Sequence, residues 1–127
     1  MPKKGKITPN GVVLKEHENA TVVFLTEQGL DIELIPKSNV SGIHTPDIIM
    51  LGEKWEMKAP KGEGKYLIAN TIQRAVKQSS NIVIDLRRVK RPQEKCLQEL
   101  RKECDRSKSI KKLKIIVKSR KIIDISK

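Results

Sequence analysis

The pattern of apolar and polar residues is most informative near the middle of the chain, over residues 47–58. An apolar run opens this stretch and ends at a Gly-Glu pair, which is typical of a tight turn. The residues after the turn alternate polar with apolar or aromatic side chains, the period of a half-buried strand. We therefore predict a β-hairpin. Its second strand should carry Glu56 and Lys58 on one face and Trp55 and Met57 on the other, toward a core.

The remaining segments predict an α/β protein with a single folded domain. Residues 1–15 are rich in Lys, Gly and Pro, and we expect a basic flexible arm that includes at most a short strand at 11–14. The periods downstream predict helices at 16–28, 66–79 and 92–106, and further strands at 30–36, 81–86, 113–117 and 122–125. Strands alternating with helices indicate a central mixed β-sheet of about five or six strands flanked by helices, formed by residues 16–127.

The charge balance narrows the class of partner. The chain has 27 Lys and Arg against 15 Asp and Glu, which gives a formal net charge of +12 and a pI near 9.9. Such an excess favours polyanions, because binding neutralises phosphates and releases their counterions. Nucleic acid is the first candidate, and an anionic membrane surface is the second. Charge alone identifies a partner class and no chemistry.

The sequence offers no membrane span, signal peptide or disulfide. No apolar run approaches the ~18 residues of a transmembrane helix, and the basic start at residues 1–6 is not followed by an apolar block. Cys96 and Cys104 fall in one predicted helix, where eight residues separate them by ~12 Å, too far for a disulfide bond. We therefore expect two free thiols and a reducing compartment.

The predicted hairpin places two acids and a lysine near one another. Asp47, at the start of its first strand, and Glu56 supply carboxylates of the kind that hold hard divalent cations. Such an ion activates water and polarises phosphate oxygens, and the Lys58 ammonium can stabilise the developing negative charge. The backbone carbonyl of Met57 is a further candidate ligand. The alternative is a solvated charge pair, since Glu63 and Lys65 repeat the Glu-x-Lys spacing in a turn.

The order of these motifs resembles the PD-(D/E)XK nuclease superfamily: Pro46-Asp47, then Glu56-Met57-Lys58 on the next strand, then a helix and a strand. More narrowly, residues 55–64 and 69–86 resemble the C-terminal toxin domains of contact-dependent growth inhibition (CdiA-type) proteins. The resemblance covers roughly residues 16–86, and the remainder fits as completion of the fold. It implies a PD-(D/E)XK-like fold and nuclease activity. Members of the group are mostly transfer-RNA nucleases, and some are metal-dependent DNases.

The resemblance also implies roles for individual residues. By position, Asp47 and Glu56 would be metal ligands together with the carbonyl of Met57, and Lys58 would be the catalytic lysine. Mg²⁺ or Mn²⁺ is the expected ion, with Zn²⁺ as an alternative.

Two further positions follow from the resemblance and have plain alternatives. The superfamily places a glutamate on its first helix near the metal, which matches Glu18 best and Glu16 second. Either carboxylate would also favour the positive N-terminus of that helix. Gln78 stands where relatives carry a supporting polar residue, and a solvated glutamine at a helix end is the alternative. His44, just before the hairpin, is more simply an incidental loop histidine than a base.

Basic side chains around the motif are candidates for substrate binding. They are Lys61, Lys65, Arg74, Lys77, Arg87 and Arg88, each of which would alone be a solvated charge. The chain has only three aromatic rings, so we expect recognition by shape and backbone rather than by stacked bases.

Taken together, the sequence predicts a small metal-dependent endonuclease that cleaves transfer RNA as a toxin against competing bacteria. The resemblance implies a cognate immunity protein, acidic to match the net charge. The absence of a delivery segment favours a domain excised from a larger secreted or surface protein, and we expect it to act in the bacterial cytoplasm. Two alternatives stand beside it: a metal-dependent DNase of the same superfamily, and a non-catalytic module that binds nucleic acid.

Overall fold

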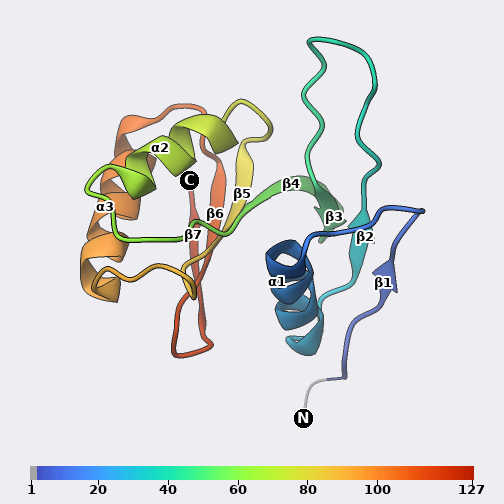
Figure 1. Ribbon diagram of the computed structural model, residues 1–127, viewed down its shortest axis with the longest axis horizontal. Helices are drawn as coiled ribbons and strands as arrows, with labels where there is room; N and C mark the ends of the chain where they lie inside the picture. Colours follow the sequence, from blue (N-terminus) through green and yellow to red (C-terminus); the bar gives the residue numbers. More distant parts are fainter. Residues whose placement is uncertain (1–2) are drawn as a thin grey trace.

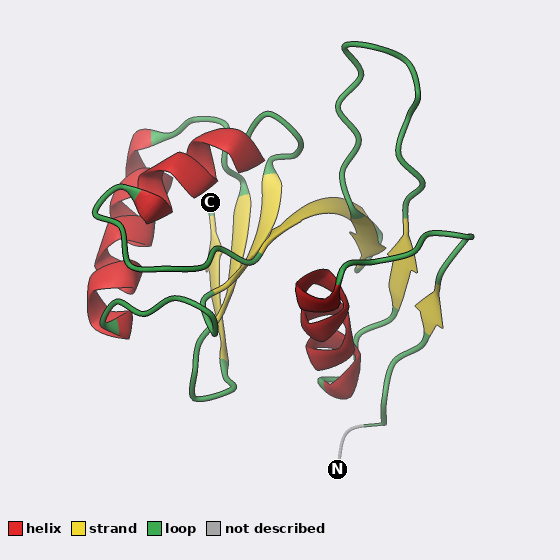
Figure 2. Cartoon of the chain, in the orientation of Figure 1, coloured by secondary structure: helices red, strands yellow, loops and turns green. Residues whose placement is uncertain are grey.

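The structure, a computed structural model, describes residues 3–127, so Met1 and Pro2 of the predicted arm lie outside it. Strands and helices alternate along the described chain (Figures 1 and 2). The strands are β1 (Ile7–Thr8), β2 (Ile32–Leu34), β3 (Ile48–Met50), β4 (Glu53–Lys58), β5 (Asn81–Asp85), β6 (Lys112–Ile116) and β7 (Ile122–Ser126). The helices are α1 (Glu16–Glu27), α2 (Leu67–Ala75) and α3 (Gln93–Arg106).

The strands form one mixed sheet in which the strand order follows the chain order. The pairs β1–β2, β4–β5 and β5–β6 are parallel, and each is connected through a helix because parallel neighbours need a crossover. The other three pairs are antiparallel. β4 joins the two halves of the sheet, since it pairs with β3 on one side and β5 on the other, and Figure 1 shows it curving between them.

Helices cover both faces of this sheet. Side chains alternate along β5, so Ile82 and Ile84 pack with α2 and α3, whereas Val83 packs with α1. One apolar cluster therefore joins α2 and α3 to β5 and β6, and a second joins α1 to β2, β3 and β4. Ile, Val and Leu supply most of both clusters.

The predicted hairpin is present as β3 and β4. Met50 pairs with Glu53, which leaves Leu51 and Gly52 as a two-residue turn, one residue earlier than predicted. Both turn residues have positive φ, at 54° and 77°. This backbone matches the twist of the flanking strands, and a glycine at the second position adopts it without strain.

The amino-terminal edge of the sheet differs from the prediction. The sheet has seven strands rather than five or six, and the strand expected at 11–14 lies earlier, as β1. Beside β1, the Ile32 N–H donates to the Lys6 carbonyl oxygen at 2.8 Å. Gly5 permits this approach, because a Cβ at that position would meet the Leu30 carbonyl oxygen at 1.9 Å.

Two helices also differ from the prediction in detail. α2 ends at Ala75 rather than Ser79, whose hydroxyl instead donates to the Lys54 carbonyl oxygen at 3.0 Å as the chain turns into β5. α1 has the predicted bounds to within one residue, but its apolar residues Ala20 and Val23 are exposed. Threonines take part of the buried face, which hides the apolar period.

Cys96 and Cys104 are free, buried thiols on α3, as predicted, and burial raises the pKa of both. Within residues 3–127, the helices are all too short or too polar to cross a bilayer.

Candidate active site

The sheet brings Asp47 and Glu56 together. β3 and β4 pair Ile48 with Trp55, so the residue before β3 opposes the residue after Trp55. The Asp47 N–H donates to the Trp55 carbonyl oxygen at 3.0 Å, which extends the pairing by one residue. Cross-strand partners project from the same face, so both carboxylates lie on one side of the sheet. Trp55 and Met57 point the other way, into the α1 cluster, as the alternation predicts.

Asp47 is contacted on both oxygens of its carboxylate. The Met57 N–H donates to Oδ2 at 2.8 Å, and the Lys37 ammonium lies 2.6 Å from Oδ1. The Asp47 side chain is only 10% exposed. Lys37 comes from the loop between β2 and β3, which extends away from the sheet in Figure 1. Nothing in the sequence of this polar loop indicates that its two ends meet and bring Lys37 to Asp47. The contact between these two residues was therefore not predicted.

Glu56 is a buried carboxylate with one satisfied oxygen. Its Oε2 lies 3.2 Å from the Lys58 ammonium. Its Oε1 is buried without a hydrogen-bond partner among residues 3–127, and we refer to it as the open oxygen. Burial, and next the neighbouring Asp47 carboxylate, raise the pKa of Glu56 to about 7, although Lys58 acts in the opposite direction. Glu56 is therefore poised between its neutral and charged forms near neutral pH.

This donor set fits a hard divalent cation. Two carboxylates adjoin each other, and a cation beside the open oxygen would satisfy it. The Met57 N–H points toward Asp47, and in an extended strand the carbonyl of the same residue points to the same side. Met57 can therefore offer its backbone oxygen at the carboxylate pair. An all-oxygen set suits Mg²⁺ or Mn²⁺ better than zinc, which favours nitrogen and sulfur.

A cleft of about 410 Å³ opens between α1, β4 and α2, and Met57 and Lys58 line it, whereas Asp47 and Glu56 do not. The residues that line it are Lys15, His17, Glu18, Thr21, Met57, Lys58, Ala59, Pro60, Lys61, Leu67, Thr71 and Arg74. Four of them are Lys or Arg and one is acidic, so the cleft favours an anion.

Glu18 lies in the wall of this cleft but apart from the carboxylate pair. Its Oε1 accepts a hydrogen bond from the Lys15 N–H at 2.9 Å, so the side chain caps the start of α1. In the described part of the chain, no three His, Cys, Asp or Glu side chains gather closely enough to share a metal ion. The structure thus brings together two of the three predicted carboxylates. Glu16, the competing candidate, lines a different cavity.

Gln78 lies at the other end of β4 from Lys58. It falls between α2 and β5, and therefore at the amino ends of the parallel strands β4 and β5, whereas Lys58 closes the carboxyl end of β4. Thr71 and Thr21 line the cleft instead. The Thr71 hydroxyl donates to the Leu67 carbonyl oxygen one turn back in its helix, and the Thr21 hydroxyl lies 3.2 Å from the His17 carbonyl oxygen, so in sequence these residues look like ordinary core threonines.

The predicted basic contacts separate by location. Lys61 and Arg74 line the cleft, and Arg74 continues with Lys77 into a shallow hollow on α2. Lys65 stands apart, with its ammonium 5.6 Å from the centre of the neighbouring tyrosine ring. Arg88 lines a separate cavity described below.

Arg87, the sixth predicted contact, has a structural role. Its guanidinium hydrogen-bonds to both oxygens of Asp85, the shortest contact being 2.7 Å, and lies 4.8 Å from the centre of the Phe24 ring. Burial raises the pKa of Asp85, but the Arg87 hydrogen bonds and the Thr21 hydroxyl at 2.8 Å outweigh it, so the pKa is lowered. The pair anchors α1 to β5.

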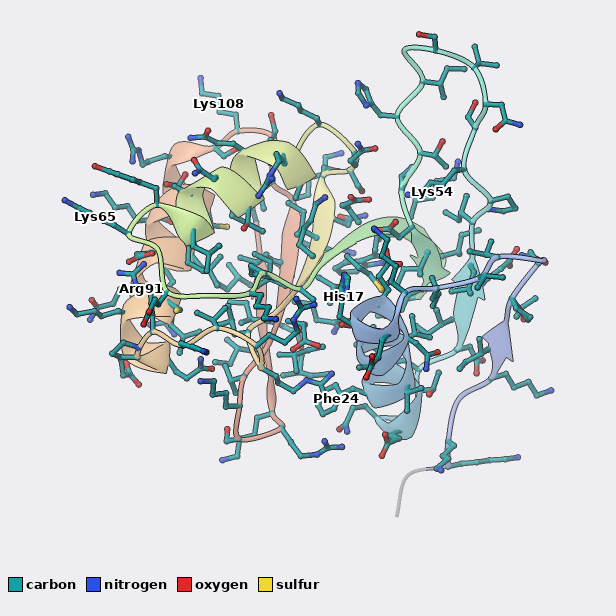
Figure 3. The ribbon with its side chains drawn as sticks, in the orientation of Figure 1. His17, Phe24, Lys54, Lys65, Arg91 and Lys108 are labelled. Atoms are coloured by element: carbon teal, nitrogen blue, oxygen red, sulfur yellow. The ribbon has the colours of Figure 1, made fainter. Side chains whose placement is uncertain are left out.

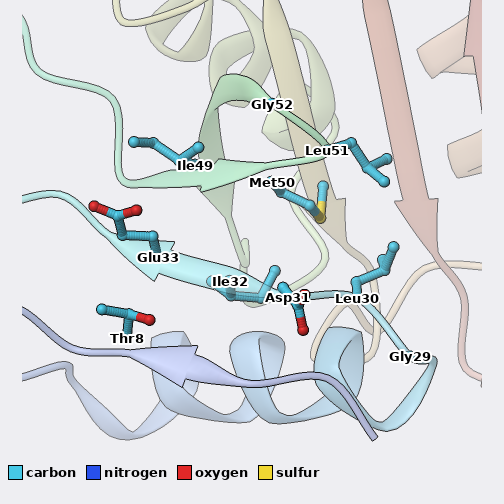
Figure 4. Close-up of a pocket in the computed structure, with 10 residues that line it drawn as sticks. All are labelled: Thr8, Gly29, Leu30, Asp31, Ile32, Glu33, Ile49, Met50, Leu51 and Gly52. Carbon is cyan, nitrogen blue, oxygen red and sulfur yellow. The ribbon is translucent and has the colours of Figure 1, made fainter. Parts of the chain in front are cut away.

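Another hollow, of about 400 Å³, lies over β1, β2 and β3 (Figure 4). Asp31 and Glu33 line it, and none of its lining residues in the described chain is Lys or Arg. It shares no lining residue with the cleft and does not suit an anion.

Comparisons with known proteins identify a family for this chain and, separately, a solved structure with the same fold. The family model described as "Contact-dependent growth inhibition CdiA C-terminal domain" matches residues 44–122, which contain Asp47, Glu56 and Lys58. Among solved structures, the "CdiA-CT/CdiI toxin and immunity complex from Burkholderia pseudomallei" matches with a TM-score of 0.75 and 23% sequence identity. The match covers 97% of this chain and 100% of that one, and at this identity it shows a shared fold. No curated protein matches in sequence.

Proposed function

The chain belongs to the CdiA C-terminal domains of contact-dependent growth inhibition, and from that premise we propose that it is a metal-dependent nuclease toxin that cleaves transfer RNA in competing bacteria. One observation carries the proposal: the open oxygen of Glu56 lies next to a second carboxylate, with the Lys58 ammonium beside them. Two adjoining carboxylates, one of them buried, repel each other until a cation binds between them.

Each residue of the site has a role in this reaction. Asp47, Glu56 and the Met57 carbonyl would hold the ion, which supplies Lewis acidity toward phosphate oxygens and acidifies bound water. Lys58 projects from the same face of β4 as Glu56 and lines the cleft, where its ammonium stabilises negative charge on the scissile phosphate. Lys61 would contact the neighbouring phosphate of the RNA backbone and so position the substrate strand.

The choice of RNA rests on charge and shape. Phe24 and Trp55 are buried, and Tyr66 is the one ring with a large exposed fraction, 65%. A single ring makes no platform for stacking several bases, so recognition relies on backbone geometry. Folded transfer RNA presents dense phosphates to a protein of net charge +12. The same residues would serve a DNase, which is the alternative function.

The test is incubation of the purified protein with total transfer RNA and, separately, plasmid DNA, in Mg²⁺, Mn²⁺, Zn²⁺ or EDTA. We expect RNA cleavage in Mg²⁺ or Mn²⁺ and none in EDTA. Asp47→Ala and Glu56→Gln should each lower the cleavage rate by at least about 100-fold, the usual order for losing one electrostatic contact to the transition state. Glu63→Gln is the matched control, because it repeats the Glu-x-Lys spacing on an exposed turn.

The outcomes separate the candidate functions. Cleavage of DNA alone would establish the DNase. Binding of either nucleic acid without cleavage would leave a non-catalytic module and make the hairpin acids structural. Normal cleavage by Asp47→Ala would place the active site elsewhere.

The toxin function also implies a protein partner. The similar structure is a complex of a toxin with an immunity protein, and this chain would bind a cognate immunity protein of its own. A net charge of +12 calls for an acidic partner. The domain would be delivered to the cytoplasm of a target bacterium, a reducing compartment that suits its two free thiols.

A further inference from the structure

A second cavity, of about 380 Å³, adjoins the cleft. Glu16, His17, Ala20, Lys61 and Arg88 line it, and two of these residues, His17 and Lys61, also line the cleft. The two hollows therefore form one path that runs from Lys58, past Lys61, to Arg88. Figure 3 shows His17 at the first turn of α1, on the side of the helix that faces the rest of the sheet.

Backbone pairing places the two cations of this cavity together. Gly62 forms an isolated parallel bridge with Val89, and the Lys90 N–H donates to the Gly62 carbonyl oxygen at 2.8 Å. This bridge fixes the turn after β4 against the turn after β5. Lys61 and Arg88 each precede a bridged residue, so the pairing holds them as neighbours.

Arg88 differs from its neighbour Arg87 in how its guanidinium is satisfied. Arg87 is bound to Asp85, whereas the Nη1 group of Arg88 is buried without a hydrogen-bond partner anywhere in the described chain. Leaving a buried donor unsatisfied destabilises a protein, and more so when the donor is charged. A guanidinium fork matches the oxygens of a phosphate, which would satisfy it. Glu16 is the one carboxylate in the cavity, against two cations.

We propose that Arg88 and Lys61 form a phosphate subsite, which binds the nucleic-acid backbone next to the phosphate held at Lys58. The subsite rests on the proposed nuclease function only for the identity of that neighbouring phosphate. It assigns Arg88 to binding and Arg87, one residue earlier, to folding. It also predicts that a substrate strand follows the path past His17 at the start of α1.

The test measures binding without metal, so that it does not depend on catalysis. A fluorescent 12-nucleotide single-stranded RNA is titrated in EDTA over 50–200 mM salt. Arg88→Gln should raise Kd by about 5- to 20-fold and reduce the slope of log K against log salt by about 1. Lys61→Gln should act similarly. Arg101→Gln, an exposed arginine on α3, is the matched control and should change Kd by less than twofold.

A direct readout comes from the cavity itself. Titration with inorganic phosphate should shift the Arg88 side-chain NMR signal at a concentration that leaves the Arg101 signal unchanged. Thermal unfolding should show Arg88→Gln at least as stable as wild type, because the variant removes an unsatisfied buried donor. Arg88→Lys should recover less than half of the lost affinity, since it lacks the fork.

The results distinguish the subsite from the proposed function. Equal Kd values for Arg88→Gln and Arg101→Gln would overturn the subsite, whether or not the wild type cleaves RNA. A protein that cleaves nothing but shows the Arg88-dependent binding would retain the subsite and lose the nuclease. Unfolding of Arg88→Gln would also overturn it, since the side chain would then be structural.

Discussion

Folding disfavours the ionised form of the Glu56 side chain. Its side chain is 5% exposed, and its pKa is about 7, against 4.5 for an unperturbed glutamate. Between those two values the native protein binds more protons than the unfolded chain, so the free energy of unfolding falls as pH rises. At ~1.36 kcal/mol for each pKa unit, the loss above pH 7 is about 3 kcal/mol. The carboxylate pair therefore destabilises the metal-free protein above pH 7.

Replacing Glu56 by Gln should remove this pH dependence. In EDTA at pH 8, Glu56→Gln should melt above wild type by roughly 9–15 °C, because a neutral amide replaces a strained carboxylate and about 3 kcal/mol is regained. Near pH 4.5 the two proteins should melt together, since wild-type Glu56 is protonated there. Thermal unfolding over this range measures the difference, with Glu63→Gln as control. A variant that melts below wild type at both pH values would mean that the native carboxylate is not strained.

Metal binding should offset most of this difference in stability. A divalent ion at a hundred times its Kd stabilises the native state by about 2.7 kcal/mol. We expect Mn²⁺ or Mg²⁺ to stabilise the wild-type protein by this amount and to leave Glu56→Gln and Asp47→Asn unchanged. Thermal unfolding without nucleic acid measures the stabilisation. Affinity should weaken below pH 7, because protons then compete for Glu56. Equal stabilisation of either variant would put the ion elsewhere.

At the scale of elements, one buried ion pair holds α1 against the sheet. Asp85 on β5 accepts hydrogen bonds from Thr21 of α1 and from Arg87, whose guanidinium also donates to the Ala20 carbonyl oxygen at 3.0 Å. The first turns of α1 form one wall of the cleft, so this contact also sets the position of that wall.

Asp85→Asn should therefore destabilise the protein. Removing one partner of a buried ion pair costs about 3–5 kcal/mol, and the partial exposure of Arg87 reduces this to about 2–4 kcal/mol. Because the pKa of Asp85 is lowered, its contribution is present above pH 4 and is lost as pH falls through the native pKa. Urea unfolding at pH 7 and pH 3 should show a gap that narrows in acid. Asp105→Asn, exposed on α3, should show little change at either pH.

The sequence predicts the central elements well because one local pattern determines them. The pattern predicts the hairpin itself, but it puts the turn one residue too late, at Gly52-Glu53, which would pair Asp47 with Lys58. The turn at Leu51-Gly52 instead places Asp47 opposite Glu56. The helix–strand alternation that follows gives β5, α3, β6 and β7 to within about one residue. These features need no information from distant parts of the chain.

Features that depend on distant contacts were not predicted. Arg87 and Arg88 are identical neighbours in sequence, and only the fold brings Asp85 and Phe24 to the first while leaving the second in a cavity. Lys37 reaches Asp47 through the closure of a polar loop. Gln78 lies away from the site because the end of α2 leads into the start of β5, which is the amino end of the parallel pair of β4 and β5.

At the scale of the whole molecule, the charge of +12 should dominate association. In EDTA, binding to transfer RNA should weaken at least tenfold between 50 and 200 mM salt, as released counterions require. Asp47→Ala should bind as tightly as wild type, because the basic cleft is intact. Fluorescence titration measures both. A salt-independent Kd would contradict phosphate contacts as the main source of affinity.

The strand order also has a consequence for the way in which the chain acquires its structure. Each strand pairs with the strand that precedes it in sequence, so none waits for a partner from the far end of the chain. Closing such short segments costs little entropy, and the sheet can grow in the order in which the chain leaves a ribosome or a pore. Asp47 and Glu56 meet as soon as β4 emerges. The β5 and α2 segments that enclose them arrive later, so a half-emerged chain holds both acids while its cleft is still unbuilt.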